Sequence, residues 1–248
     1  MPVSLARMPY VVRLTLVAAM ALVVVEAAGR AQAPAGPAAK PMRIGFIGSG
    51  NIGGAIGELF ARAGHEVFFS SRNPDSLKAL VTRVGPRARA GTVSEAIAFG
   101  DVIFLGVPYS SMPDISKQYA GALKGKIVLD AGNPNVRRDG AMAEPAVARG
   151  AGLATAEYLP GARIVRAFNY LNNKVFLNEA HRAGERVGVP LASDDKEAMA
   201  VAAQLVTDAG FEPVIVGPLS AGKGFDSSSP LFLKTMTARE LRKALGVP

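Results

Sequence analysis

The chain has 248 residues, of which 49% are apolar, and a formal net charge of +8. It contains no cysteine, which excludes disulfides, thiolate metal sites and a thiol nucleophile. Its basic residues are scattered rather than gathered with aromatic ones, so the charge predicts no nucleic-acid-binding surface. No cluster of His, Asp and Glu has metal-ligand spacing. The length allows one α/β domain with a small extension.

Residues 1–33 have the three parts of a signal peptide: a start with two arginines, an apolar run over 14–25, and an A-x-A-type cleavage site at 31–33. The apolar run is shorter than the ~20 residues that a helix needs to cross a bilayer, so we expect no stable membrane span. Residues 34–41 have the composition of a flexible linker. A periplasmic or secreted protein is therefore predicted. Two alternatives stay open: the segment remains as an uncleaved anchor, or translation starts at Met42 and the protein is cytoplasmic.

Residues 42–69 predict a strand, a glycine turn, a helix and a second strand. A G-x-G-x-x-G sequence that follows a strand and opens a helix indicates dinucleotide binding. The first glycine takes the tight turn, the second leaves room for the pyrophosphate, and the third lets the helix pack against the strand. The helix N-terminus would offer free N–H groups to the phosphates. The predicted cofactor-binding residues in this loop are Gly48, Ser49, Gly50, Asn51, Ile52 and Gly53.

The second strand, expected over 66–70, ends in Ser71, Arg72 and Asn73. An NAD site usually carries an acid here, ~20 residues beyond the first glycine. No acid is present, and Arg72 with Ser71 offers charge and hydrogen-bond donors to a 2′-phosphate. Asn73 followed by Pro74 suits a helix start whose positive end would face the same group. NADP(H) is therefore predicted over NAD(H); the alternative is that Arg72 is an ordinary solvated loop residue.

Helices and strands then alternate along the chain. We expect helices over 75–84 and 92–100, the latter opened by a capping box at Thr92 and Glu95, and strands near Ala88 and over 101–107 and 126–130. This alternation predicts a Rossmann-type doubly wound parallel sheet with helices on both faces. Such sheets bind ligands beyond the carboxyl ends of their strands. We therefore expect the nicotinamide beside the last two strand ends, at Val107, Pro108, Tyr109, Asn133 and Pro134.

The second half of the chain predicts a sixth strand, a helix that starts at Asn169, and a further β-α-β unit. That unit comprises a strand over 186–192, a helix over 194–209 and a strand over 213–216, followed by a polar loop and a last helix ending at Leu245. We assign residues 42–170 to the NADP-binding domain. Residues 171–248 form an extension packed on the same domain.

The sequence shows no obvious catalytic His–Asp pair and leaves the catalytic residues unidentified. His65 and His181 are expected at the surface. Lys223 and Asp226 lie in the polar loop over 221–230, where a second substrate would have room, although a mobile loop is the simpler interpretation.

Four sequences occur in order: GFIGSGNIGGAIGELFARAGHEVFFSSRNP, DVIFLGVPYSS, IVLDAGNP and LPGARIVRAFNYL. Together they resemble the family of NADP oxidoreductases that work with the deazaflavin coenzyme F-420, over roughly residues 42–219. The same fold serves as the cytosolic reductase domain of STEAP-type metalloreductases, and the glycine loop alone resembles pyrroline-5-carboxylate reductase. The resemblance implies hydride transfer between NADP(H) and a deazaflavin or flavin-type acceptor, which needs ring alignment more than a side-chain acid or base. It also implies a homodimer, for which the residues give no signal of their own.

Two other functions stay open. A pyrroline-5-carboxylate or hydroxy-acid reductase usually adds an all-helical C-terminal domain, which the predicted β-α-β unit does not match. A non-catalytic NADP-binding sensor is compatible with the fold. Two features depart from the resembled family: the signal-like N-terminus, and the segment after Leu219, which carries no motif tied to a deazaflavin.

Overall fold

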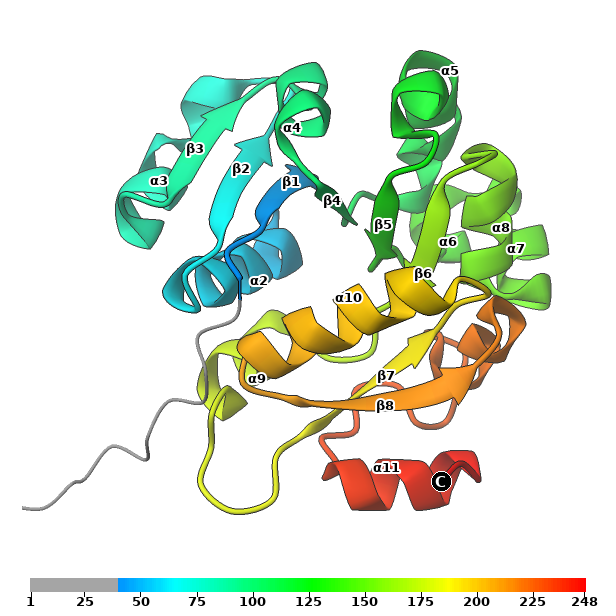
Figure 1. The fold of residues 1–248 in the computed structure, drawn as a ribbon. Coiled ribbons are helices and arrows are strands. Elements are labelled where there is room, and N and C mark those ends of the chain that lie inside the picture. Colours follow the sequence, from blue (N-terminus) through cyan, green and yellow to red (C-terminus); the bar gives the residue numbers. More distant parts are fainter. Residues whose placement is uncertain (1–39) are drawn as a thin grey trace, which may run out of the picture. The chain divides into compact units, whose positions relative to one another are not determined.

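The computed structural model describes residues 40–248, which belong to one compact unit (Figure 1). The predicted signal peptide, residues 1–33, and all but the end of the predicted linker, residues 34–41, lie outside the described residues. In the described part of the chain, no helix combines the length and the apolar character needed to cross a membrane.

An eight-stranded sheet runs through the unit in the order β3-β2-β1-β4-β5-β6-β7-β8. Its central strands are buried on both faces, which is why they read as continuous apolar runs. The predicted Rossmann-type α/β fold is confirmed. The strands are β1 (Arg43–Ile47), β2 (Glu66–Ser70), β3 (Ala88–Gly91), β4 (Val102–Leu105), β5 (Ile127–Asp130), β6 (Arg163–Arg166), β7 (Gly188–Ala192) and β8 (Glu212–Gly217).

The sheet departs from the predicted parallel arrangement at one join. Strands β7 and β8 are parallel to each other, but β7 is antiparallel to β6 and pairs with it only through Arg166 and Ala192. An apolar run records that a strand is buried and carries no signal for its direction. The two C-terminal strands, β7 and β8, therefore extend the sheet antiparallel to β6.

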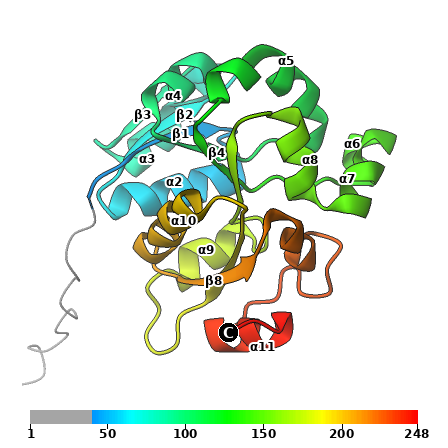
Figure 2. The same ribbon diagram turned by 45° about the vertical axis from the view of Figure 1, so that its right-hand side comes forward.

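Helices cover both faces of the sheet. Helices α2, α9 and α10 contribute to one apolar cluster, and α4, α5 and α8 to the other. Figures 1 and 2 show α2 and α10 side by side, although they belong to distant parts of the sequence. The helices are α2 (Asn51–Arg62), α3 (Lys78–Val84), α4 (Val93–Phe99), α5 (Met112–Leu123), α6 (Val136–Asp139), α7 (Glu144–Arg149), α8 (Ala151–Tyr158), α9 (Asn173–Glu179), α10 (Lys196–Asp208) and α11 (Ala238–Leu245).

Three short helices, α6 to α8, lie between β5 and β6 and were not predicted. Gly140 and Gly150, both with positive φ, separate them, so no stretch is long enough to show a helical period. The helix expected from Asn169 begins instead at Asn173, where the side chain of Asn172 accepts a hydrogen bond from the backbone N of Val175. Asn169 itself is buried in the loop before it.

His65 lies in the interior, so the prediction that it is a surface residue is wrong. Its Nδ1 accepts a hydrogen bond from the backbone N of Met42 at 3.1 Å, and its Nε2 lies 3.1 Å from Oδ2 of Asp208 on α10. Burial lowers the pKa of the imidazole, which keeps it neutral in this position. A single residue before a strand gives no sequence signal for such a distant partner. His181 is exposed, as predicted.

Candidate functional site

The glycine loop after β1 is shaped by close backbone approaches. A Cβ atom on Gly48, whose φ is +97°, would lie 2.4 Å from the carbonyl O of Gly106. A Cβ atom on Gly53 would lie 2.2 Å from the carbonyl O of Gly48. A Cβ atom on Gly50 would meet no atom within 4 Å. Packing therefore requires glycine at positions 48 and 53, whereas Gly50 leaves open space of the kind that a pyrophosphate needs.

The N-terminus of α2 follows directly from this loop. Its N-cap residue is Gly50, which makes no side-chain capping bond, and its first turn contains no acidic residue. The first N–H groups of a helix have no partner within the helix, and the helix dipole adds positive charge at the same end. Asn51, Ile52 and Gly53 form this first turn, so their backbone is suited to an anion.

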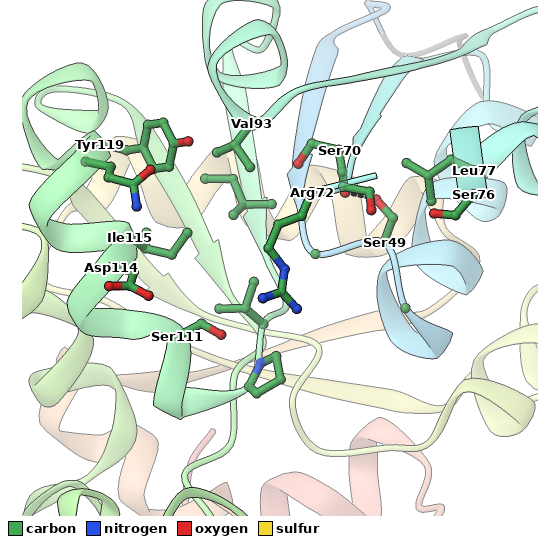
Figure 3. Close-up of a pocket in the computed structure, with 17 residues that line it drawn as sticks. Ser49, Ser70, Arg72, Ser76, Leu77, Val93, Ser111, Asp114, Ile115 and Tyr119 are labelled. Atoms are coloured by element: carbon green, nitrogen blue, oxygen red, sulfur yellow. Dashed lines mark hydrogen bonds between the residues drawn. The ribbon is translucent and has the colours of Figure 1, made fainter. Parts of the chain in front are cut away.

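A cavity of about 450 Å³ opens between the ends of β1 and β2 and helix α5 (Figure 3). Seven of the predicted residues line it, and they come from three strand ends. Because the carboxyl ends of neighbouring parallel strands share one edge, loops distant in sequence meet there. These residues are Gly48, Ser49, Gly50, Ser71, Arg72, Val107 and Pro108.

The opposite wall was missed by the sequence analysis. Helix α5 turns one side toward the cavity, and the spacing of its lining residues is helical. That spacing, directly after the loop at Pro108, is the signal that could have found them. The missed residues on α5 and at its N-cap are Ser111, Asp114, Ile115, Gln118 and Tyr119. Three further lining residues outside α5, Ser76, Leu77 and Val93, were also missed.

The polar end of the cavity is built around Arg72. The side chain of Arg72 is exposed and extends into the space between the strand ends and α5 (Figure 3). It joins no ion pair within residues 40–248. Beside it, the hydroxyl oxygen of Ser71 accepts a hydrogen bond from the backbone N of Asn73 at 3.1 Å, which leaves its proton available. A guanidinium and a hydroxyl donor without a paired acid fit a phosphate group.

The remaining surface of the cavity is less polar. Leu77, Val93, Ile115 and Tyr119 contribute apolar or aromatic side chains that suit a flat ring. The carboxylate of Asp114 is the acidic group in the lining. Within residues 40–248, no three His or acidic side chains gather closely enough to hold a metal ion.

Two predicted residues near the strand ends do not line the cavity. Tyr109 is buried and packs edge-on against Tyr158, with 5.9 Å between the ring centroids. Burial raises the pKa of its phenol to about 12. Asn73 lies outside the cavity at the start of a short 3-10 turn, η2 (Pro74–Leu77), where Pro74 takes the first position as predicted but Asn73 makes no side-chain capping bond.

Asn133 and Pro134 also lie outside the cavity, in the loop after β5. The Oδ1 atom of Asn133 accepts a hydrogen bond from Nη2 of Arg166 at 2.8 Å, and its Nδ2 donates to the backbone O of Asn169 at 2.7 Å. The carbonyl O of Pro134 accepts a hydrogen bond from Oγ of Ser227 at 3.4 Å. Side chains from beyond β5 therefore hold this loop.

A buried charge cluster lies behind the same loop. Arg166 is fully buried between Asp130, at the end of β5, and Asp226. Desolvation raises the pKa of Asp130, against the attraction of Arg166. Part of the predicted polar loop forms a 3-10 helix, η5 (Leu219–Phe225), which Asp226 follows directly. The Nζ atom of Lys223 donates to the backbone O of Ala148 at 2.7 Å, which also ties this segment down.

Comparisons with known proteins agree with this architecture. Residues 43–134 match the family model described as NADP oxidoreductase coenzyme F420-dependent. The chain is 27% identical over 188 residues to the metalloreductase STEAP3 of Rattus norvegicus, covering 73% of this chain and 35% of that protein. It therefore spans about a third of the length of that curated relative.

Solved structures share the fold. A hypothetical protein from Sinorhizobium meliloti is 29% identical with a TM-score of 0.69, covering 80% of this chain and 96% of that one. A putative F420-dependent NADP-reductase from Arthrobacter sp. FB24 is 20% identical with a TM-score of 0.62, covering 74% and 88%. The comparisons confirm the predicted resemblance to this family of NADP oxidoreductases. They leave the second substrate open.

Proposed function

We propose that this protein binds NADP(H) and transfers a hydride between it and a deazaflavin or flavin-type acceptor. The observation that carries the proposal is Arg72, which faces the cavity without an acidic partner in the described chain, next to the open space at Gly50. The cofactor, when bound, supplies or accepts the hydride at its nicotinamide ring. The family match over residues 43–134 covers both of these residues.

Different residues of the chain would bind different parts of the cofactor. The first turn of α2 and the backbone from Gly48 to Gly53 would hold the pyrophosphate. Arg72 and Ser71 would hold the 2′-phosphate and so select NADP(H) over NAD(H). Val107, Pro108 and the loop at Asn133 and Pro134 would border the nicotinamide, because they follow the next strand ends along the same edge.

Catalysis then depends on orientation and not on a side-chain proton donor. Tyr109, the phenol nearest in sequence to the rim, is buried and does not line the cavity. Holding two rings in a reactive arrangement lowers the barrier by removing the entropy of bringing them together. The residues around the nicotinamide therefore act by fixing its position.

The C-terminal part of the chain bears on the alternative enzymes. Residues 188–217 form β7, α10 and β8, of which the two strands extend the same sheet, and α9 and α11 are short. The separate helical domain expected of a pyrroline-5-carboxylate or hydroxy-acid reductase has no counterpart among residues 171–248. We keep a homodimer as part of the proposal on the resemblance alone.

The test is a titration of the purified protein with NADPH and NADH, followed by NADPH oxidation with flavin, deazaflavin and imine substrates. We expect tighter binding of NADPH and turnover with a flavin or deazaflavin. Gly50→Val is the matched control: its side chain would enter the open space, so the fold should persist while both cofactors are lost. Turnover with an imine alone would favour the reductase alternative. Binding without any turnover would favour a sensor. Equal affinities for NADPH and NADH would show that Arg72 does not select between the two cofactors.

We also propose that residues 1–33 direct export to the periplasm or beyond. The basis is the order of arginines, apolar run and A-x-A sequence in that segment. Cell fractionation and N-terminal sequencing of the mature protein test this. A periplasmic protein that begins at Pro34, directly after the A-x-A sequence, is expected, whereas a cytoplasmic protein that begins at Met42 would contradict it.

A further inference from the structure

We infer that Asp226 is a positioning residue for the nicotinamide end of the cofactor site, acting through the buried side chain of Arg166 on the loop at Gly132 and Asn133. The inference rests on the proposed binding of NADP(H). It gives the C-terminal part of the chain, which lies outside the family match over residues 43–134, a direct role in that site.

All three nitrogens of the Arg166 guanidinium donate hydrogen bonds to defined acceptors. Its Nε donates to Oδ1 of Asp226 at 2.8 Å, and its Nη2 lies 2.7 Å from the same oxygen and donates to Oδ1 of Asn133 at 2.8 Å. Its Nη1 donates to the backbone O of Asp130 at 3.1 Å and to that of Gly132. A planar fork with five donors fixes the relative positions of all the groups that it contacts.

Asp226 is the group that orients this fork. Its second oxygen, Oδ2, accepts a hydrogen bond from the backbone N of Ala151 at 2.8 Å, at the start of α8. The carboxylate is thereby held from two sides and is only 4% exposed. Gly222 covers the aliphatic part of the arginine, because a Cβ atom there would lie 3.1 Å from Cγ of Arg166. A buried guanidinium needs such a counter-ion, since an unpaired charge in the interior is strongly unfavourable.

The arginine in turn fixes the amide of Asn133. Its Oδ1 faces the guanidinium and its Nδ2 donates to the backbone O of Asn169. Reversing the amide would place N–H groups against N–H groups, so one orientation is strongly preferred. Asn169 is held as well, because its Nδ2 donates to the backbone O of Phe225, the residue before Asp226. Residues 225–226 are therefore connected to this loop by two chains of hydrogen bonds, one through Arg166 and one through Asn169.

None of these contacts touches the phosphate end of the cavity. Arg166, Asn169 and Asp226 do not line it, whereas Arg72 and Ser71 do. A change at Asp226 should therefore alter the position of the nicotinamide and leave the adenosine 2′-phosphate end unchanged. This separation distinguishes positioning from a general loss of structure.

The experiment compares two ligands on the full-length wild-type protein and on Asp226→Asn. The first ligand, 2′,5′-ADP, has the phosphate end without a nicotinamide, and the second is NADPH, whose fluorescence reports the surroundings of its ring. We expect Asp226→Asn to bind 2′,5′-ADP within twofold of wild type. It should bind NADPH roughly tenfold more weakly, the size expected for one charged hydrogen bond, with fluorescence shifted toward that of free NADPH.

The matched control is Asp101→Asn, the same substitution at an exposed carboxylate that pairs with Arg43. It should behave as wild type with both ligands. Equal loss of both ligands in Asp226→Asn, or no loss of either, would overturn the inference while the proposed function stands. A wild-type protein that binds neither ligand would overturn both.

A second variant decides the question if Asp226→Asn does not fold. Asn133→Ala leaves Arg166 paired with Asp226 and removes only the half-buried amide at the end of the chain of contacts. We expect the same result as above, with 2′,5′-ADP affinity kept and NADPH affinity lowered. Wild-type affinity for NADPH in Asn133→Ala would overturn the inference.

Discussion

The two ends of the candidate cofactor site are held in place by different means. At the phosphate end, the glycine loop, Ser71 and Arg72 come from one contiguous β-α-β stretch, and the charged group is exposed. At the expected nicotinamide end, the loop at Asn133 depends on a buried arginine and on Asp226, which lies 60 residues beyond Arg166 in the sequence. A local motif therefore builds the first end, whereas packing between distant segments builds the second.

The largest difference should appear in stability. Arg166→Met removes the basic partner that the two buried carboxylates of the cluster share, and breaking a buried ion pair costs about 3–5 kcal/mol. Arg72→Met changes an exposed side chain and should stay within about 0.5 kcal/mol of wild type. The free energy of unfolding in urea measures both. An Arg166→Met protein within about 1.4 kcal/mol of wild type, a tenfold change in the folding equilibrium, would remove the contrast.

The reverse contrast is expected in binding. Arg72→Gln removes a charged partner for the 2′-phosphate, which is worth about 1.5–3 kcal/mol, or roughly ten- to a hundredfold in the dissociation constant of NADPH. The affinity for NADH should not change, because NADH lacks that phosphate. Calorimetric titration of wild type and variant with both cofactors measures the ratio. Equal losses of affinity for NADPH and NADH would show that Arg72 does not bind the 2′-phosphate.

The phosphate end has its own structural requirement at Gly53, where backbone packs on backbone. In Gly53→Ala the new Cβ would lie 2.2 Å from the carbonyl O of Gly48, and such overpacking costs about 1–3 kcal/mol. The control is Gly121→Ala on α5, where a Cβ would meet nothing within 4 Å. That change should stabilise the helix by about 0.5–1 kcal/mol. Thermal unfolding of both variants separates the steric cost at Gly53 from the general stabilisation of a helix by alanine. A Gly53→Ala protein more stable than wild type would contradict the predicted steric cost.

The smallest expected effect is a pH dependence in the buried cluster. Desolvation raises the pKa of Asp130, so the folded protein keeps that proton at pH values where the unfolded chain has lost it. Stability from this group is therefore complete below the ordinary pKa of Asp and falls as the pH rises above it. Asp130→Asn lacks this loss, so its melting temperature relative to wild type should increase from pH 4 to pH 8.

Asp101 provides a control of opposite sign. Its hydrogen bond to Arg43 lowers the pKa of that carboxyl, so its contribution is present above the ordinary pKa of Asp and is lost as the pH falls. Asp101→Asn should therefore become slightly less stable than wild type toward pH 8, by little because the pair is exposed. A constant difference between Asp130→Asn and wild type across this range would contradict the assignment.

Particular residues show which structural features can be predicted from the sequence and which cannot. The spacing of Thr92 and Glu95 predicts a capping box, and the structure has both of its hydrogen bonds. Strong local signals of this kind involve residues within one turn of each other. The wall of the cavity on α5 had a readable period but no chemical motif, so it was missed. The burial of His65 had no local signal, because its partner Asp208 is 143 residues away.

By itself, the sequence determined the Rossmann-type fold, the glycine turn and the placement of Arg72 after the second strand, because each depends on residues that are adjacent along the chain. Only the tertiary structure decided that β7 enters the sheet reversed and that Asp226 reaches Arg166. It also decided that Asn133 is held by both Arg166 and Asn169. The physical reason is that strand direction and buried ion pairs are selected by packing between segments far apart in sequence, and apolar runs and isolated charges do not encode their partners.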